Sequence, residues 1–256
     1  MGLNIGYNGY TMNNGSASIS VIIPVLNEAE RISQLIEHVC GLKKNNNVEI
    51  IVSDGDPCGS TINTVSHEKV IKVLSEKGRG RQMNKGAAAA TGDILLFLHA
   101  DTLLPEGAFE KILAIMRTGR YAGGAFDLEL VSDRTSYRII ESAATYRSRI
   151  TRIPFGDQAI FIRKDIFHGL GGFREFPIME DVELMRSLKR TGHRIFIIAT
   201  KVKTSPRRWE REGILYCTIR NWVLVILYLM GVRPNTLARF YRTAPILPLT
   251  KVRSGE

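Results

Sequence analysis

The chain has 256 residues, of which 44% are hydrophobic and 23% are charged. These proportions exclude global disorder, and the length suits one α/β domain with an extension rather than a multidomain assembly. The three cysteines, Cys40, Cys58 and Cys217, lack CxxC spacing, which excludes a disulfide scaffold and a cysteine zinc site. The longest apolar run, 222–230, is about half of what a bilayer crossing requires, and no secretory signal is visible. We therefore expect a cytoplasmic protein.

The formal net charge of +10 is unevenly distributed. Residues 200–256 contain eleven Lys or Arg against three Glu, so this segment carries +8 of the total. A basic segment favours an anionic partner, which would be a nucleic acid, a membrane surface or a phosphorylated substrate. A solvated surface that maintains solubility explains the charge equally well, and composition leaves these alternatives open.

Taken in chain order, the sequence first predicts a disordered tail at 1–18, which is rich in Asn, Gly and Ser and has no periodicity. A catalytic domain at 19–210 and a helical, basic extension at 211–256 follow. Short β-branched runs predict strands, and apolar residues at helical spacing predict helices. The first half contains predicted strands at 19–23, 48–52, 70–74 and 94–98, and predicted helices at 28–42, with Asn27 as N-cap, and at 82–90. The second half contains predicted strands at 123–131, 159–163 and 194–198, and predicted helices at 135–149, 180–191 and 214–230.

This alternation predicts an α/β fold with a doubly wound, mostly parallel sheet and a small mixed or antiparallel extension. Ligands bind such sheets at the carboxyl ends of the strands, so the residues just after each strand are the first candidates for a site. Two common nucleotide signatures are weak or absent. The run 78–83 begins like GxGxxG but has Met83 in place of the third glycine, and no GxxxxGK[ST] occurs.

Two carboxylates follow predicted strands, Asp54 after the second and Asp101 after the fourth. Each taken singly is more often a helix cap than a ligand. Together they would face one crevice, where a carboxylate and diphosphate oxygens can hold Mg²⁺ or Mn²⁺. His99 could assist such an ion or simply pack against a neighbouring loop.

Three further groups could contribute to a site. Arg79, Arg81 and Lys85 open the helix at 82–90, where guanidinium groups and a helix N-terminus suit a phosphate. Glu180 and Asp181 open a later helix, where acids either complement the helix dipole or supply a general base. Arg208 beside Trp209 offers phosphate binding next to a stacking surface. Each group alone is unspecific.

Taken in order, these segments resemble the family 2 glycosyltransferases with the GT-A fold, and in particular their small bacterial members. The resemblance covers 19–209. It includes the opening strand and loop at 20–28, the acid at Asp54, the segment 77–92, the strand ending at Asp101, the GGF and Glu180–Asp181 stretch at 167–184, and a QxxRW-like element at 205–209. Several motifs in order are far more specific than any single one.

The resemblance implies roles for particular residues. Asp181, with Glu180, would be catalytic, and Asp101 would bind Mn²⁺ or Mg²⁺. Substrate and nucleotide contacts would come from Pro24, Leu26, Glu28, Asp54, Arg81, Asn84, His99, Asp157, Arg208 and Trp209. Two departures are visible: the metal motif reads His99-Ala100-Asp101 and lacks its first acid, and Ser205 stands where the Gln of QxxRW would be. Assigning the base contact to Asp54 rather than Asp56 is a choice between two neighbours.

The sequence thus leads us to expect an inverting transfer of a sugar from a nucleoside diphosphate sugar, UDP-linked rather than GDP-linked, to an acceptor hydroxyl. The acceptor is unknown and could be lipid-linked. For the apolar helix at 214–230 we favour core packing, with a peripheral membrane contact as the alternative. Two other classes compete: a sugar-nucleotide pyrophosphorylase, whose glycine-rich, lysine-bearing loop is absent here, and a nucleic-acid or membrane-surface binding module. We expect no nucleic-acid partner, because no aromatic-basic RNA signature is present.

Overall fold

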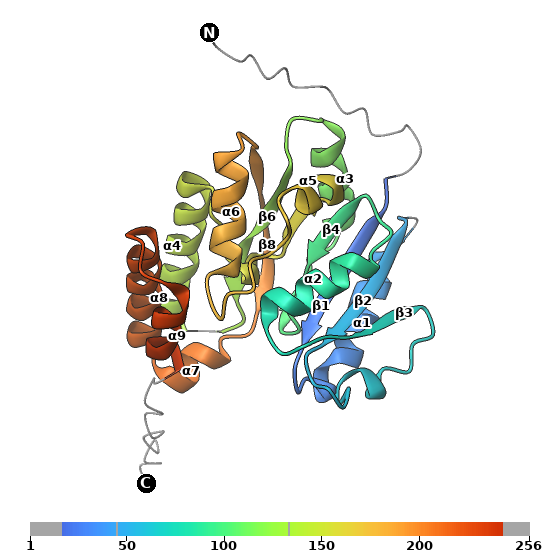
Figure 1. The fold of residues 1–256 in the computed structure, drawn as a ribbon, viewed down its shortest axis with the longest axis horizontal. Helices are drawn as coiled ribbons and strands as arrows, with labels where there is room; N and C mark the ends of the chain where they lie inside the picture. Colours follow the sequence, from blue (N-terminus) through green and yellow to red (C-terminus); the bar gives the residue numbers. More distant parts are fainter. Residues whose placement is uncertain (1–16, 45, 133, 243–256) are drawn as a thin grey trace.

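A computed structural model describes residues 17–44, 46–132 and 134–242 of the chain (Figure 1). The first half alternates strands and helices, as the sequence predicts. Its elements are β1 (Ile19–Val25), α1 (Ala29–Leu42), β2 (Val48–Asp54), the 3-10 turn η1 (Ile62–Thr64), β3 (Val70–Leu74), α2 (Arg79–Ala89), β4 (Ile94–Phe97), β5 (Thr102–Leu103) and α3 (Ala108–Arg117).

The second half builds the far side of the sheet and a group of helices beside it. Its elements are β6 (Gly123–Leu130), α4 (Thr135–Thr151), the 3-10 turn η2 (Gly156–Gln158), β7 (Ile160–Arg163), α5 (Lys164–Gly169), α6 (Glu180–Arg190), β8 (Ile195–Thr204), α7 (Arg207–Glu212), α8 (Ile214–Leu229) and α9 (Pro234–Arg242).

These strands form one sheet in the order β3-β2-β1-β4-β7-β6-β8-β5. The pairs β1–β2, β1–β4 and β2–β3 are parallel, which makes half of the sheet doubly wound. Strand β7 is antiparallel to both β4 and β6, while β6 and β8 are parallel. The predicted fold class, including a mixed extension, is therefore confirmed.

Side chains that alternate along the strands fill a core on each face of the sheet. In β1, Ile19, Val21 and Ile23 pack with α1 and α3, whereas Ile22 packs on the opposite face with α2. A strand covered by helices on both faces is apolar at nearly every position. This explains why the run at 19–23 reads as a continuous hydrophobic segment, with all of its residues buried.

Two details of the predicted N-terminal region are wrong. Asn27 is not the N-cap of α1: Glu28 occupies that position, and Asn27 adopts a left-handed conformation with φ of 58°. Asparagine tolerates this conformation, which turns the chain sharply between strand and helix. The predicted disordered tail extends too far, because the N–H and hydroxyl of Ser18 both donate to the carboxylate of Asp93 at 2.9 Å. The rest of that tail, 1–16, lies outside the described residues.

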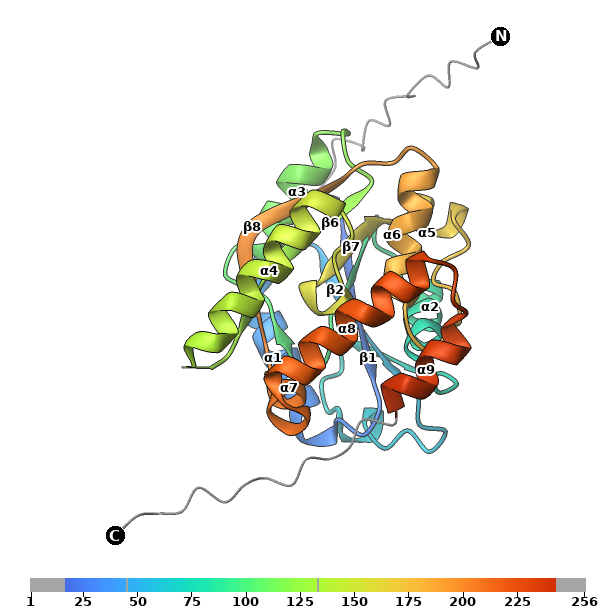
Figure 2. The ribbon, with the colours of Figure 1, turned by 90° about the vertical axis from the view of Figure 1, so that its left-hand side faces the viewer.

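The C-terminal helices pack on one side of the molecule (Figure 2). Leu224 and Tyr228 of α8 and Leu237 of α9 form a small apolar cluster with Ile178 and Val182 at the start of α6. The inner side of α8 is therefore part of a core, as we favoured from the sequence. No helix in the described part of the chain is long and apolar enough to cross a membrane.

Candidate active site

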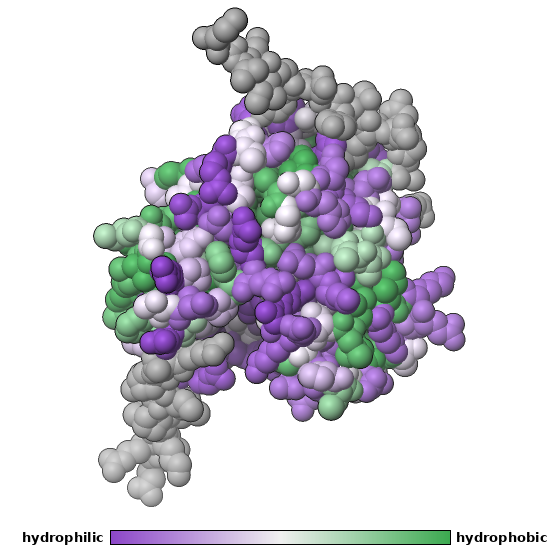
Figure 3. All heavy atoms as spheres, in the orientation of Figure 1, coloured by the Kyte–Doolittle hydropathy of each residue, from purple (hydrophilic) through white to green (hydrophobic). Residues whose placement is uncertain are grey.

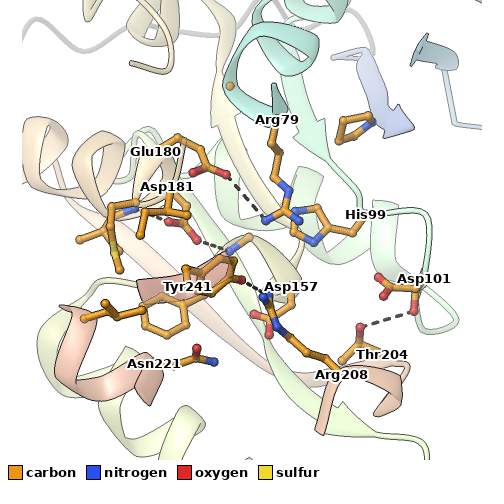
Figure 4. Close-up of a pocket in the computed structure, with 18 of the residues that line it drawn as sticks. Arg79, His99, Asp101, Asp157, Glu180, Asp181, Thr204, Arg208, Asn221 and Tyr241 are labelled. Atoms are coloured by element: carbon orange, nitrogen blue, oxygen red, sulfur yellow. Dashed lines mark hydrogen bonds and ion pairs between the residues drawn. The ribbon is translucent and has the colours of Figure 1, made fainter. Parts of the chain in front are cut away.

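A cavity of about 1200 Å³ lies where the carboxyl ends of β1 and β4 meet the first turns of α2 and α6. Its other walls come from α4, α7, α8 and α9, so the sheet supplies one side and the later helices supply the other. Figure 4 shows acidic and basic side chains pointing into this space from several elements. The cavity thus lies at the sheet edge where a doubly wound fold binds ligands.

Asp181 and Glu180 face the cavity from the first turn of α6. One carboxylate oxygen of Asp181, Oδ2, accepts the backbone N–H of Gly156 at 2.7 Å, and Oδ1 accepts that of Val182 at 2.7 Å. Glu180 is buried, with Oε1 3.7 Å from the Arg79 guanidinium. Burial and the adjacent Asp181 carboxylate raise the pKa of Glu180. Glu180 therefore retains its proton more readily than a solvent-exposed glutamate does.

Asp157 and Arg147 form a second, deeply placed pair of charges. Burial raises the pKa of Asp157 to about 6, with the neighbouring carboxylate of Asp181 adding to the effect, and burial lowers the pKa of Arg147 to about 10. The Arg147 guanidinium stacks 3.2 Å from the centre of the Phe155 ring. Asp157 Oδ1 and Arg147 Nη1 are buried without a hydrogen-bond partner. Buried polar atoms of this kind are rare, and a bound polar ligand would satisfy them.

Asp101 and His99 lie on the opposite side, directly after β4. The Asp101 side chain is 36% exposed, and its nearest cationic partner is Arg207 at 3.7 Å. Burial raises the pKa of Asp101. Burial, with the charge of Arg79, lowers the pKa of His99 well below its usual range, so the imidazole is neutral at physiological pH. A Cβ atom at Gly156 would approach His99 Nε2 to 2.7 Å, which places the ring against that loop.

The last wall depends on a network of arginines around α7. Arg208 donates to the Tyr241 hydroxyl of α9, and its guanidinium carbon lies 3.9 Å from the centre of the Tyr241 ring. Arg208 Nε also lies 3.5 Å from Glu212, which Arg220 of α8 approaches to 2.5 Å. Glu212 therefore joins α7 to α8 and holds Arg208 at the cavity.

The structure brings most of the predicted site residues into this one cavity. The predicted residues that line it are Pro24, Leu26, Glu28, Arg81, His99, Asp101, Asp157, Glu180, Asp181, Arg208 and Trp209.

Asp54 and Asn84 are not among them. The Asp54 side chain is completely buried, and its carboxylate accepts the backbone N–H groups of Asp56, Thr61 and Ile62 at 2.9, 2.9 and 3.1 Å. The carboxylate thus organises the loop after β2, and the contact of Asp54 with a base stays a prediction. Asp56 does not line the cavity either.

Asn84 has a comparable structural task. Its side chain donates to the Phe173 carbonyl and accepts the Phe173 N–H, both at 2.8 Å, so it fixes the turn before α6 to α2. Arg81, although it lines the cavity, is paired with Glu76 and Glu175. Arg79 is the arginine of this turn that approaches Glu180, as Figure 4 shows.

Sequence reasoning missed the side chains that the later helices contribute. Arg147 comes from α4, Asn221 from α8, and Tyr241 from α9, and all three line the cavity. No motif marks any of them. Arg147 lies in an amphipathic helix among other arginines, and only the packing of α4 against η2 brings it to Asp157.

The side-chain atoms that could ligate a metal ion decide which metal the site fits. Among the described residues, no group of three or more His, Cys, Asp or Glu side chains is arranged to hold an ion. Asp101 offers a partly exposed carboxylate, which is the hard oxygen donor that Mg²⁺ and Mn²⁺ prefer. The residues therefore fit an ion that takes most of its ligands from phosphate oxygens and water, with Asp101 as its protein ligand.

Residues 20–176 match the family model described as "Glycosyl transferase family 2". Among curated proteins, dolichol-phosphate mannosyltransferase of Pyrococcus furiosus is 27% identical over 176 residues, which are 65% of this chain and 48% of that protein. Glucosyl-3-phosphoglycerate synthase of Mycolicibacterium smegmatis is 32% identical over 114 residues, which are 40% of this chain and 37% of that protein. The chain spans about half the length of the curated relatives it matches or less.

Solved structures extend the likeness to the fold. A glucosyl-3-phosphoglycerate synthase from Mycobacterium tuberculosis, in complex with Mn²⁺, uridine diphosphate and phosphoglyceric acid, has a TM-score of 0.58 at 19% identity, over 84% of this chain and 79% of that one. A mannosyltransferase from Pyrobaculum calidifontis, in complex with GDP-mannose and Mn²⁺, has a TM-score of 0.56 at 18% identity, over 78% and 60%. The fold of this chain is thus the GT-A fold.

Proposed function

The chain belongs to glycosyl transferase family 2, and on that premise we propose that it transfers a sugar from a nucleoside diphosphate sugar to an acceptor hydroxyl, with inversion at the anomeric carbon. The observation that carries this proposal is the meeting of four carboxylates with several arginines, among them Arg79 and Arg208, around one cavity at the sheet edge. The carboxylates are those of Asp101, Asp157, Glu180 and Asp181. Acidic groups converge in this way where a cation and a polar ligand compensate their charge.

The donor would lie between the sheet edge and the first turns of α2 and α6. Arg79 and Arg208 reach the cavity from opposite sides and would offset the negative charge that develops on the leaving diphosphate. Asp101 would hold Mn²⁺ or Mg²⁺, and a bound divalent ion would supply further neutralisation of that charge. His99, which stays neutral, adds a hydrogen-bonding group beside Asp101 without a second charge.

Asp181 is the general base of this proposal. The backbone N–H of Gly156 fixes the orientation of its carboxylate, which takes the proton from the acceptor hydroxyl. The oxygen then attacks the anomeric carbon as the bond to the diphosphate breaks on the opposite face. The proton ends on Asp181, the electron pair of the broken bond ends on the diphosphate, and the anomeric configuration inverts.

We propose a uridine-linked donor before a guanosine-linked one. The solved neighbour that contains uridine diphosphate is matched over a larger share of both chains than the neighbour that contains GDP-mannose. The acceptor is a hydroxyl compound of unassigned class, and a cytoplasmic location with a peripheral membrane contact belongs to the same proposal.

Donor turnover with water as acceptor tests this function before the acceptor is known. The chain is incubated with Mn²⁺ and, separately, with UDP-glucose, UDP-N-acetylglucosamine and GDP-mannose, and the released sugar is followed by proton NMR. We expect slow release of nucleoside diphosphate and free sugar from one donor. The first-formed sugar should have the anomeric configuration opposite to that of the sugar in the donor. Release of nucleoside monophosphate and sugar phosphate would instead identify a nucleotide-sugar hydrolase. Formation of nucleoside triphosphate and sugar phosphate when pyrophosphate is added would identify a pyrophosphorylase, and either result would overturn the proposal.

A further inference from the structure

The side of α8 that faces away from the cavity is apolar and exposed. Its exposed large side chains recur every three or four positions, which places them on one side of a helix. They are Leu215, Ile219, Trp222, Val223, Ile226 and Met230, and their exposed fractions range from 46% to 76%. A helix of a water-facing surface normally carries polar residues there.

Two neighbouring helices extend this surface. Ile139, Tyr146 and Ile150 of α4 are exposed by 71%, 70% and 62%, and Phe240 of α9 is exposed by 60%. Helices α4, α8 and α9 lie on the same side of the molecule in Figure 2, and Figure 3 shows hydrophobic residues along the edge where α8 lies. We call the exposed apolar side chains of α4, α8 and α9 the outer face. Large apolar side chains exposed together on one side of a molecule mark an interaction site.

The charges of the same helices are almost all positive. Together, α4, α8 and α9 contain six arginines, no lysine and a single acid, Glu141. Glu141 is buried and paired with Arg138 and Lys201, so it gives the surface no free negative charge. Four of these arginines are used elsewhere: Arg138, Arg149 and Arg220 pair with Glu141, Asp127 and Glu212, and Arg147 lines the cavity. Arg152 after α4 and Arg233 between α8 and α9 are exposed beside the apolar side chains.

From this combination we propose that the outer face binds to an anionic membrane surface, with α8 lying in the plane of the interface. An apolar helix face inserts into the headgroup boundary, and flanking arginines are attracted to anionic lipids. A second copy of the chain fits less well. A two-fold contact presents the same patch from both subunits, which would bring like charges together on each side.

The position of the cavity adds to the argument. Trp222 is 46% exposed on the outer face and also lines the cavity. Beside it, the cavity wall is apolar, with Ile140 and Ala144 of α4 and Val225 of α8. A docked molecule would therefore hold this side of the cavity next to the bilayer. This inference rests on the peripheral membrane contact of the proposed function and deepens it, and flotation can fail while donor turnover holds, because the outer face lies outside the catalytic carboxylates.

Vesicle flotation of the full chain tests the proposal. Vesicles of phosphatidylcholine with phosphatidylglycerol are compared with vesicles of phosphatidylcholine alone, at low and high salt. We expect the chain to float with the anionic vesicles, and binding to weaken with salt without disappearing. The variant Ile219→Glu/Ile226→Glu should bind at least about tenfold more weakly, because interfacial binding scales with the apolar area inserted.

A matched control variant introduces the same two negative charges at positions away from the outer face. Leu74 and Leu103 are 50% and 41% exposed on strands β3 and β5, away from the outer face. Leu74→Glu/Leu103→Glu should retain most of the binding, and circular dichroism should show the wild-type fold for both variants. The proposal is overturned if the wild-type chain does not float with the anionic vesicles, or if the two double variants lose vesicle binding equally. It is also overturned if light scattering shows a wild-type dimer that does not bind vesicles and that Ile219→Glu/Ile226→Glu dissociates.

Discussion

Glu180 and Asp181 are adjacent in the sequence but meet different surroundings. Glu180 is 4% exposed, and burial together with the Asp181 carboxylate raises its pKa. Asp181 instead has its carboxylate oriented by the Gly156 N–H at 2.7 Å. Two neighbouring carboxyls with different environments are the usual way in which a site separates a proton holder from a base. We therefore assign the base to Asp181 and leave Glu180 to shape the pocket with Arg79.

This assignment predicts unequal effects of two isosteric substitutions. Asp181→Asn should lower the donor turnover rate by about 10²–10⁴-fold, since a positioned base contributes that much. Glu180→Gln should cost less than about tenfold, because a protonated carboxyl and an amide carry the same charge. Calorimetry with UDP and Mn²⁺ should give wild-type affinity for Asp181→Asn. Equal losses of turnover in the two variants, or loss of UDP binding with Asp181→Asn, would contradict the assignment.

Asp157 predicts a pH-dependent effect on stability. Its folded pKa of about 6 lies above the ordinary pKa of 3.8 for an aspartate, so the folded state holds a proton that the unfolded state releases first as the pH rises. Stability therefore falls as the pH rises from about 4 to about 6, and the loss is complete above that range. Asp157→Asn removes this penalty. The variant should exceed wild type in unfolding free energy by up to about 3 kcal/mol at pH 8, with no such gain below about pH 4.

Urea unfolding of both proteins between pH 4 and pH 8 measures this difference. Asp165 provides a control of opposite sign: burial acts against it, but hydrogen bonds from Arg163 and the Ile166 N–H lower the pKa of Asp165. Its side chain is 50% exposed, so Asp165→Asn should lose only a small amount of stability, and only at neutral pH. A difference between Asp157→Asn and wild type that stays constant with pH would show that Asp157 is not an uncompensated buried carboxyl.

At the scale of elements, the turn η2 connects the two halves of the site. Gly156 donates to Asp181, and a Cβ atom there would lie 2.7 Å from His99 Nε2 and 3.6 Å from Asp181 Oδ2. Gly156→Ala should therefore displace the His99 ring, whereas Asp181 Oδ2 would stay in ordinary van der Waals contact, and the backbone of the turn stays accessible to alanine. We expect turnover to fall by about 10²-fold, which is typical of small displacements of catalytic groups. Gly169→Ala is the control, since no atom lies within 4 Å of its Cβ position. Wild-type turnover in Gly156→Ala would show that the position of the His99 ring against this turn does not matter for turnover.

The sequence predicts strands better than it predicts the ends of helices. The predicted strand at 70–74 coincides with β3, because its apolar side chains and the polar residues that flank them define both ends of the strand. The prediction for α1 has the correct last residue but the wrong cap, because Asn27 suits both an N-cap and the left-handed turn that it adopts. Helices α3 and α9 were not predicted, although Phe109, Ile112 and Met116 are buried at helical spacing.

At the scale of the whole molecule, whether the sequence predicts a site residue depends on how the fold brings that residue to the cavity. Asp101 and Asp181 lie at the ends of elements, so the motif order alone places them in one cavity. Arg147 and Tyr241 arrive through the packing of α4 and α9, which no spacing in the sequence encodes. Asp54 shows the reverse case: it occupies a strand end, but its own loop satisfies its carboxylate. A position at a strand end therefore does not by itself leave a side chain free for a ligand, because the local backbone can satisfy it, as it does in the loop after β2.

The central claim is that Asp101 and Asp181 serve a single nucleoside diphosphate site, one on the donor side and the other on the acceptor side. Titration calorimetry of UDP against wild type, Asp101→Ala and Asp181→Asn, each with and without Mn²⁺, tests it most directly. We predict that Mn²⁺ strengthens UDP binding to wild type and to Asp181→Asn alike, and that Asp101→Ala loses this strengthening. If UDP and GDP both fail to bind wild type with Mn²⁺, or if Asp101→Ala retains the full effect of Mn²⁺, the claim is contradicted.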